Sequence, residues 1–229
     1  MKTIALKLVL ATTLLSFLAC KDTSKTTLNY TYANEENSLK CENIDTKLFT
    51  EALLSFEDDI TKYYDNNLNN RNRNYSLFFK NASSNRLKLE EIVSPHSLEV
   101  FNALKTEKNL WNQDNSLNYN HPIFTCIGGK ISDKDLSTTF NALVSTNSMR
   151  RPLYEAALKN KHHLISQDNF LALYAALDYY YAGIFNIDPT KVTEEVEVSQ
   201  EAKRLEELKE KLKKENETPN NDPHAGHNH

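Results

Sequence analysis

The chain has 229 residues, and its 27 basic and 31 acidic side chains give a formal net charge of −4. Only four glycines occur, which is too few for the turns of an all-β domain, and they form no glycine-rich phosphate loop. The mild acidity argues against nucleic-acid binding, which requires a basic patch. The composition predicts a mainly α-helical protein: an irregular multi-helix bundle with at most one short β-like segment.

Residues 1–19 are expected to be a targeting segment and not part of the fold. Lys2 and Lys7 form a short basic region, and an apolar run follows them. This run is too short to span a bilayer comfortably, since spanning takes about 20 residues. Ala19 at its end is followed directly by Cys20. This arrangement resembles a bacterial lipoprotein signal peptide, and the resemblance covers these first residues only.

The resemblance implies that the peptide is cut before Cys20 and that this cysteine carries the lipid. Several acyl chains anchor a protein stably, because each buried CH2 contributes about 0.8 kcal/mol. Lys21 follows the cysteine, where an aspartate favours inner-membrane retention in well-studied lipoproteins, so the outer membrane is the expected location, facing the periplasm or the cell surface. The high Asn and Lys content is similar to that of Bacteroidota lipoproteins. An ordinary secretory peptide is the alternative.

Residues 20–44 are polar and predict a lipidated tether. Cys41 and Cys126 remain after processing, and an even pair in an oxidising compartment most simply forms a disulfide. It would close a loop of about 85 residues and contribute roughly 4 kcal/mol. A nucleophilic Cys126 would need a histidine base such as His121, and no other residue supports that alternative.

Residues 45–190 are predicted to be a helical domain. Its first helix begins near Asp45 or Thr46 and shows apolar residues at three- and four-residue steps, namely Phe49, Ala52, Leu53, Phe56, Ile60 and Tyr63. Residues 69–74 predict a loop, and residues 75–93 predict one or two shorter helices. Ser94 and Pro95 are an N-cap and a first helical residue for the next helix.

The middle of the domain predicts a polar loop over residues 109–120, packed on the core through Trp111. Residues 122–127 are the one β-like run, ended by Gly128 and Gly129, and a single short run makes no sheet. Two alternatives remain for Gly128, Gly129 and Lys130. They form either a simple turn or an anion site made by their backbone N–H groups.

Two further helices are expected next, one capped by Ser132 or Asp133 and one beginning near Pro152. Their predicted inward residues are Leu136, Phe140, Leu143, Val144, Leu153, Ala156 and Ala157. Ser166 then caps a helix over residues 167–182 that is apolar almost all round and therefore central. Gly183 is the natural residue after its end.

Asp178 lies within this apolar helix, and a buried carboxylate must be paired or protonated. Arg150 and Arg151 are its candidate partners in a structural ion pair. The alternative is a ligand or carbohydrate pocket formed by Asp178, Tyr174 and Tyr181. The adjacent histidines His162 and His163 are interpreted as an exposed helix end, since neighbouring positions point in different directions.

Residues 191–217 predict a charged amphipathic helix with a stripe formed by Val198, Leu205, Leu208 and Leu212. This stripe either packs back on the bundle or docks a partner helix. Residues 218–229 predict a disordered tail with His224, His227 and His229. Three imidazoles on a flexible chain can bind Zn, Cu or Ni, and the alternative is a solvated tail without metal.

No catalytic motif stands out, and no cofactor other than that metal is predicted. The leading hypothesis is therefore a non-enzymatic cell-envelope lipoprotein. It would act as an accessory or scaffold subunit that binds partner proteins, attached to the membrane through its lipid and without nucleic acid. A periplasmic metal-binding protein and a ligand or carbohydrate binder are the alternatives.

Overall fold

A computed structural model describes residues 28–34, 36, 39–64 and 70–192, together with Leu205, Lys209 and Lys213. This part of the chain is mainly helical and contains no strand, which confirms the fold class predicted from composition. An isolated bridge between Trp111 and Leu117 is its one β-type pairing. Across these ranges, no helix combines the length and apolar character that crossing a membrane requires.

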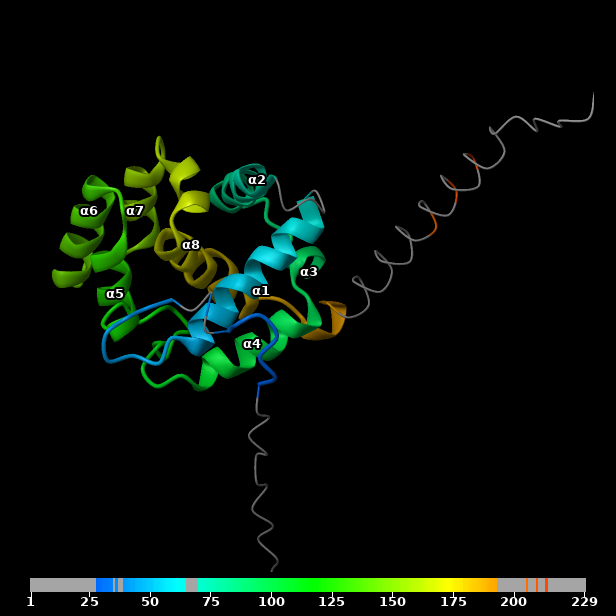
Figure 1. Ribbon diagram of the computed structural model, residues 1–229, viewed down its shortest axis with the longest axis horizontal. Coiled ribbons are helices and arrows are strands. Elements are labelled where there is room, and N and C mark those ends of the chain that lie inside the picture. The colour runs from blue at the N-terminus through cyan, green and yellow to red at the C-terminus, as the bar shows by residue number, and fades with distance from the viewer. Residues whose placement is uncertain are drawn as a thin grey trace, which may run out of the picture.

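The helices form an irregular bundle (Figure 1). In chain order they are α1 (Lys47–Tyr64), α2 (Arg71–Ser83), α3 (Leu89–Ile92), α4 (Pro95–Thr106), α5 (Pro122–Lys130), α6 (Lys134–Ser145), α7 (Arg151–Leu158), the 3₁₀ helix η2 (His162–Gln167), α8 (Asn169–Ala175), the π-helix η3 (Ala176–Tyr181) and α9 (Ala182–Ile184).

Helix α1 contacts α2, α3, α4, α8 and η3. Its predicted apolar face is buried: Phe49, Phe56 and Ile60 expose at most 1% of their surface. Tyr63, predicted on the same face, is 38% exposed. It lies in the last turn, where its hydroxyl donates to Oε2 of Glu91 at 2.8 Å.

The predicted loop over residues 69–74 is wrong, because α2 begins at Arg71. Arg71 donates to the carboxylate of Glu57 and to the backbone carbonyl of Ser166. Asn74, in the same turn, is fully buried. These contacts with α1 and η2 stabilise a helical turn whose asparagines have low helix propensity by themselves.

Two local features between α3 and α5 are confirmed. Ser94 caps α4, since its hydroxyl accepts the backbone N–H of Ser97 at 3.1 Å. The loop after α4 packs on the core through Trp111, whose Nε1–H donates to the carbonyl of Leu104 at 2.8 Å. The indole ring also meets Phe185 edge-on.

The β-like run predicted at residues 122–127 is wrong, because these residues form most of α5. Nδ1 of His121 accepts the backbone N–H of Ile123 at 3.2 Å and so caps the helix, and Pro122 occupies its first position, where proline is favoured. Ile123 and Ile127 are four residues apart and both fully buried. Burial of this helical face therefore outweighs the β-propensity of the run.

Two glycines have roles that differ from the predictions, and neither has a positive φ. Gly128 does not end a strand but lies inside α5, where a Cβ would come within 2.1 Å of Oδ1 of Asn141 in α6. Gly183 does not follow the last helix but lies inside α9, where a Cβ would come within 2.4 Å of Leu89. Both glycines permit close helix approach.

The next two helices are placed as predicted, but one of them faces differently. Asp133 caps α6 by accepting the backbone N–H of Leu136 at 2.9 Å, and the leading inward residues of α6 are buried. In α7 the buried residues are Tyr154 and Leu158, whereas Leu153, predicted inward, is 50% exposed. Tyr154 decides the orientation because its ring packs between Phe140 and Tyr174.

The single apolar helix predicted over residues 167–182 consists of three consecutive segments, α8, η3 and α9. Its cap is Asp168 and not Ser166, since Oδ1 of Asp168 accepts the backbone N–H groups of Phe170 and Leu171 at 2.8 and 3.1 Å. Almost every side chain of α8 and η3 is buried, which confirms the predicted central position.

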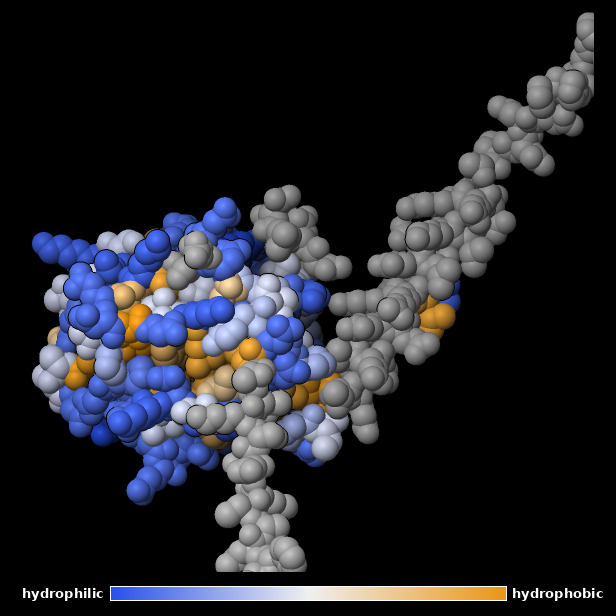
Figure 2. Space-filling model, turned by 60° about the horizontal axis from the view of Figure 1, so that its bottom comes forward, coloured by the Kyte–Doolittle hydropathy of each residue, from blue (hydrophilic) through white to orange (hydrophobic). Residues whose placement is uncertain are grey.

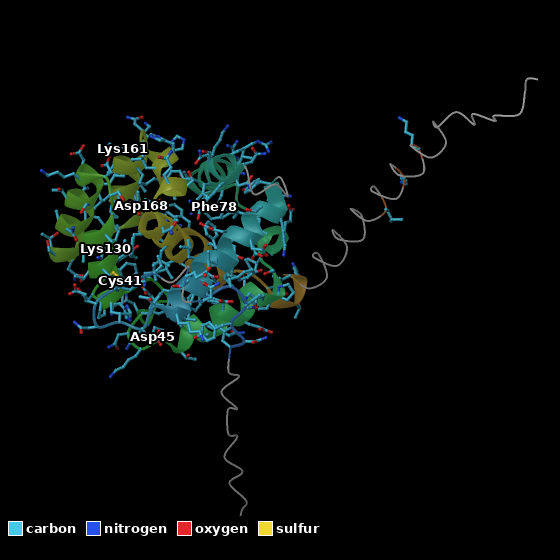
Figure 3. The ribbon with its side chains drawn as sticks, in the orientation of Figure 1. Cys41, Asp45, Phe78, Lys130, Lys161 and Asp168 are labelled. Atoms are coloured by element: carbon cyan, nitrogen blue, oxygen red, sulfur yellow. A yellow bond between two sulfur atoms is a disulfide. The ribbon has the colours of Figure 1, made fainter. Side chains whose placement is uncertain are left out.

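The buried side chains form one continuous core, and the face in Figure 2 shows apolar side chains in a central band bordered by hydrophilic ones. The predicted disulfide is present: Cys41 and Cys126 are bonded with a Cα–Cα distance of 5.8 Å across a sequence separation of 85. It ties the segment before α1 to α5 (Figure 3).

Candidate functional site

Asp178 is 5% exposed and accepts hydrogen bonds from three side chains. Oδ1 accepts the hydroxyl of Tyr119 at 2.9 Å, and Oδ2 accepts Nε of Arg151 at 3.0 Å and the hydroxyl of Tyr174 at 3.1 Å. Arg151 also donates to the backbone carbonyl of Asp178. The ion pair expected for this carboxylate is thus made by Arg151, whereas Arg150 is exposed.

The three consecutive tyrosines that end the π-helix reach three separate partners. The hydroxyl of Tyr179 donates to Oε2 of Glu155 at 3.4 Å, that of Tyr180 to the carboxylate of Asp59, and that of Tyr181 to the carbonyl of Ala52 at 3.0 Å. The structure therefore brings Tyr174 and Asp178 together and places Tyr181 at α1.

The electrostatics of this cluster hold its hydroxyls protonated. Burial, and then the charge of Asp178, raise the pKa of Tyr119 and of Tyr174 above the ordinary value. Burial lowers the pKa of Arg151, but the attraction of Asp178 outweighs it and the net direction is upward. A carboxylate with this many fixed donors cross-links the bundle and has little capacity left for a ligand.

An open groove lies beside this cluster, between α2 and α7, with η2 at one end. Its volume is about 660 Å³, within the roughly 300–1,000 Å³ of small-molecule sites. The groove is lined by Ser76, Leu77, Phe79, Lys80, Ser83, Pro152, Glu155, Ala156, Lys159 and His162. The sequence did not predict this groove. The apolar residues on the outer face of α7 could have indicated it, but they were predicted to point into the core.

The floor of the groove is aromatic and connects to the Asp178 cluster. The ring of Phe79 is parallel to that of His162, with 6.2 Å between ring centroids, and it packs on Tyr179 at 5.4 Å. The guanidinium of Arg151 lies over the same Tyr179 ring, 4.6 Å from its centroid. Tyr179 therefore links the floor of the groove to the ion pair of Arg151 and Asp178.

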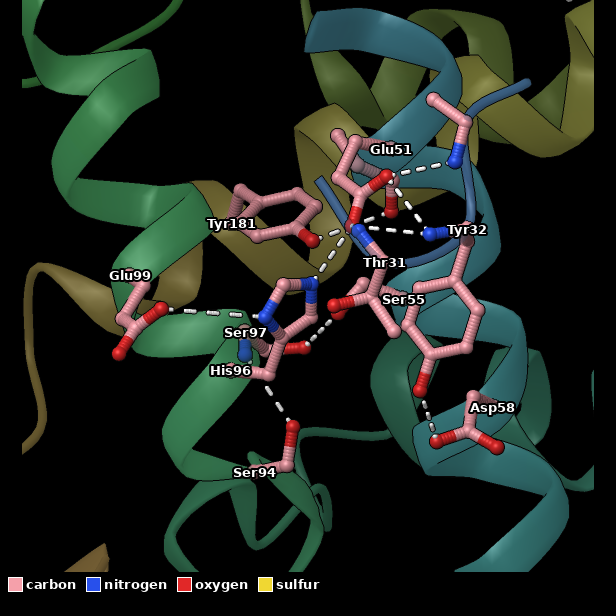
Figure 4. Close-up of polar contacts among 12 residues, drawn as sticks. Thr31, Tyr32, Glu51, Ser55, Asp58, Ser94, His96, Ser97, Glu99 and Tyr181 are labelled. Atoms are coloured by element: carbon pink, nitrogen blue, oxygen red, sulfur yellow. Dashed lines mark hydrogen bonds and ion pairs between the residues drawn. The ribbon is translucent and has the colours of Figure 1, made fainter. Parts of the chain in front are cut away.

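A second polar site lies at Glu51, which is completely buried in α1 (Figure 4). Its carboxylate accepts the backbone N–H groups of Thr31, Tyr32 and Ala33 at 2.7, 3.0 and 2.7 Å. Nε2 of His96 in α4 contacts the same carboxylate at 2.7 Å. We call this arrangement of Glu51, His96 and residues 31–33 the Glu51 clamp.

The clamp holds an ionised carboxylate in the interior. Burial raises the pKa of Glu51, but the hydrogen bonds from Thr31, Ala33 and His96 outweigh it, and the net pKa lies below the ordinary value. Next to the clamp, the hydroxyl of Tyr32 donates to Oδ2 of Asp58 at 2.8 Å. The chain before α1 is thereby fixed on the bundle.

Several predicted site residues lie outside the described residues: Cys20, Val198, Leu208, Leu212, His224, His227 and His229. Leu205 is described, and it is 52% exposed. The rings of His162 and His163 are 6.4 Å apart at 79° and share no site. Within the described ranges, no group of three or more His, Cys, Asp or Glu residues has a metal-binding arrangement. Comparison with protein-family models, curated proteins and solved structures gives no match.

Proposed function

We propose that this chain is a lipid-anchored protein of the bacterial outer membrane. Its helical domain acts as a non-enzymatic scaffold that binds partner proteins. The observation that carries the proposal is the Glu51 clamp, because it fixes the chain on the bundle shortly after the proposed anchor at Cys20.

The clamp limits how far the bundle lies from the anchor. Cys20 and Thr31 are eleven positions apart, and an extended chain covers at most about 3.6 Å per residue. The clamped segment therefore lies within about 40 Å of the acyl chains. A bundle held this close, by a segment tied to α1 and α4, has one end directed to the membrane and the rest available to partners.

The disulfide supports the compartment. Structural disulfides persist in oxidising environments such as the bacterial periplasm and the cell surface. The bond between Cys41 and Cys126 also attaches Cys41, which follows the clamp in the chain, to α5. The proposed anchor, the clamp and the disulfide then act in series along one stretch of chain.

The proposed partner contact is the stripe of Val198, Leu205, Leu208 and Leu212. Leu205 exposes 52% of its surface, and an exposed leucine at helical spacing with three others is typical of a helix that docks in a partner groove. This stripe follows Val192, which is buried in the bundle.

The anchor is tested by labelling cells with an alkyne fatty acid. We expect label and membrane association in the wild type and in the Cys41→Ser, Cys126→Ser double variant, and neither in Cys20→Ser. The double variant keeps Cys20 and shows whether the loss of other cysteines has the same effect. Label that persists in Cys20→Ser would refute the lipid anchor.

The partner contact is tested with a photo-reactive residue at position 205 in native membranes. We expect one discrete cross-linked product, with the same residue at position 134 on α6 giving none. In an otherwise unmodified chain, Leu205→Glu should abolish co-purification of the cross-linked partner. Lys209→Ala, which changes the charge equally, should not. Equal effects of the two substitutions would reject the stripe as the docking element.

A further inference from the structure

We infer that the groove between α2 and α7 is a binding site for a small amphipathic anion. The apolar part of the ligand lies on Phe79 and against α7, and its anionic group lies between Lys80 and Lys159. This inference rests on the groove alone and does not require the proposed lipid anchor or the partner stripe.

The two helices leave an apolar surface open between them. α2 packs on α1 and η2, whereas α7 packs on α6. The walls between them therefore expose Pro152 and Ala156 to the groove instead of to a helix. Phe79 forms the floor and is 7% exposed, with its ring held in place by His162 and Tyr179. A rigid aromatic floor offers apolar contact without an ordering cost.

The charge of the groove comes from two lysines, Lys80 and Lys159. Among the described lysines, Lys62, Lys88 and Lys161 each pair with a carboxylate at 2.6–2.9 Å, whereas exposed lysines such as Lys130 and Lys134 do not. Neither Lys80 nor Lys159 has a carboxylate within 4.0 Å in the same part of the chain.

Glu155, the carboxylate that lines the groove, can neutralise at most one of these two lysines. Glu155 receives the hydroxyl of Tyr179 at 3.4 Å, so its side chain is directed to the floor. Two ammonium groups against one carboxylate leave the lining positive, and low-dielectric walls focus such a potential on a bound anion.

The test is calorimetry on residues 21–229, which keep every described residue and lack the predicted leader and Cys20, so that neither lipid nor detergent competes for the groove. The probes are decanoate and decyltrimethylammonium, which share an apolar chain and differ in charge, each below its micelle concentration. We expect decanoate to bind one site at micromolar to millimolar concentration and the cation to bind at least tenfold more weakly. Equal binding of the two probes, or no binding of decanoate, would overturn the proposal.

Matched variants locate the site. Lys80→Gln with Lys159→Gln should weaken decanoate binding at least tenfold. Lys130→Gln with Lys134→Gln removes the same charge from exposed positions of α5 and α6 and should leave binding unchanged. Ala156→Trp fills the groove from an exposed position and should abolish binding, whereas Ala142→Trp, also exposed, should not. Wild-type binding by Ala156→Trp with an unchanged melting temperature would refute the groove as the site.

Discussion

The hydroxyl of Tyr180 donates a hydrogen bond to the carboxylate of Asp59, which precedes it by 121 positions. The same carboxylate oxygen, Oδ2, accepts the backbone N–H of Ser94 at 2.9 Å. One buried carboxylate thus joins η3, α1 and the beginning of α4. Burial raises the pKa of Asp59 above 3.8, although the hydrogen bonds from Tyr180 and Ser94 oppose that shift.

This raised pKa predicts a pH dependence for Asp59→Asn. The folded state holds the proton of Asp59 more tightly than the unfolded chain, so the wild type loses stability as pH rises from about 3.8 through the raised pKa. The asparagine has no proton to lose, and its Oδ1 can accept both donors. We expect the free energy of unfolding of Asp59→Asn, relative to wild type, to increase over that window in urea titrations.

The control for this prediction is Asp45→Asn, at an exposed aspartate before α1. It removes the same kind of carboxylate from a position where that group is exposed. Parallel curves for Asp59→Asn and wild type would mean that the carboxylate is not preferentially protonated in the folded state.

Glu51→Gln should open the clamp. The amide keeps one acceptor oxygen where the carboxylate has two, and it leaves backbone N–H groups among residues 31–33 unpaired. We expect a loss of about 2–4 kcal/mol in the free energy of unfolding at pH 7 and faster amide exchange at Thr31 and Ala33. Glu99→Gln, at a carboxylate 64% exposed near His96, should change neither quantity measurably.

The clamp also has a pH signature of opposite sign to that of Asp59. The pKa of Glu51 is lowered in the folded state. Its contribution to the free energy of unfolding is therefore complete above the pKa that Glu51 has in the unfolded chain, and it is lost as pH falls through the pKa of the folded state. The protection factors of the Thr31 and Ala33 amides, which are exchange rates corrected for the intrinsic pH dependence, should therefore fall in acid in the wild type. In Glu51→Gln this acid effect should be absent, and its persistence there would show that another group controls the segment.

Arg151 and Arg150 are a natural matched pair. Arg151→Gln leaves the buried carboxylate of Asp178 without its cation, while Arg150→Gln removes the same charge from an exposed neighbour. The side chain of Arg151 is 42% exposed, so water screens part of the loss and we expect about 1–3 kcal/mol. Arg150→Gln should stay within about 0.5 kcal/mol of wild type, and equal urea midpoints for the two variants would contradict this.

Removing the disulfide should destabilise the bundle without changing its fold. The double substitution Cys41→Ala, Cys126→Ala is expected to lower the free energy of unfolding by about 2–5 kcal/mol, with the same far-ultraviolet circular dichroism at pH 7. Reduction of the wild type by dithiothreitol should give the same loss. If reduction leaves the melting temperature unchanged, the two sulfurs are not bonded in the protein.

Features encoded within one helical turn were predicted from the sequence. The cap at Ser94, the cap at Asp133 and the buried face of α1 each depend on residues three or four positions apart, which local periodicity and capping chemistry reveal. The partner of Asp178 was narrowed to two arginines for a different reason: a buried carboxylate needs a cation, and Arg150 and Arg151 were suitable neighbours.

Features that depend on distant residues were not predicted. α5 is helical because its apolar side chains meet α6 and α8, and its β-branched sequence alone favours a strand. α2 begins at Arg71 because Glu57 and Ser166 receive its guanidinium. The Glu51 clamp needs backbone N–H groups from residues 31–33, and backbone groups have no sequence signature.

By itself, the sequence determined that the protein is helical, which apolar stripes are buried in α1 and α6, and which two cysteines pair, because composition, hydrophobic period and the number of cysteines are properties of the chain. Only the tertiary structure decided where surface stays open. The groove depends on Tyr154 turning α7 so that Ala156 faces outward, and on Arg71 placing α2 opposite. Those orientations result from contacts between different helices, such as Tyr154 with Phe140 and Tyr174 and Arg71 with Ser166, and the periodicity within one helix carries no information about them.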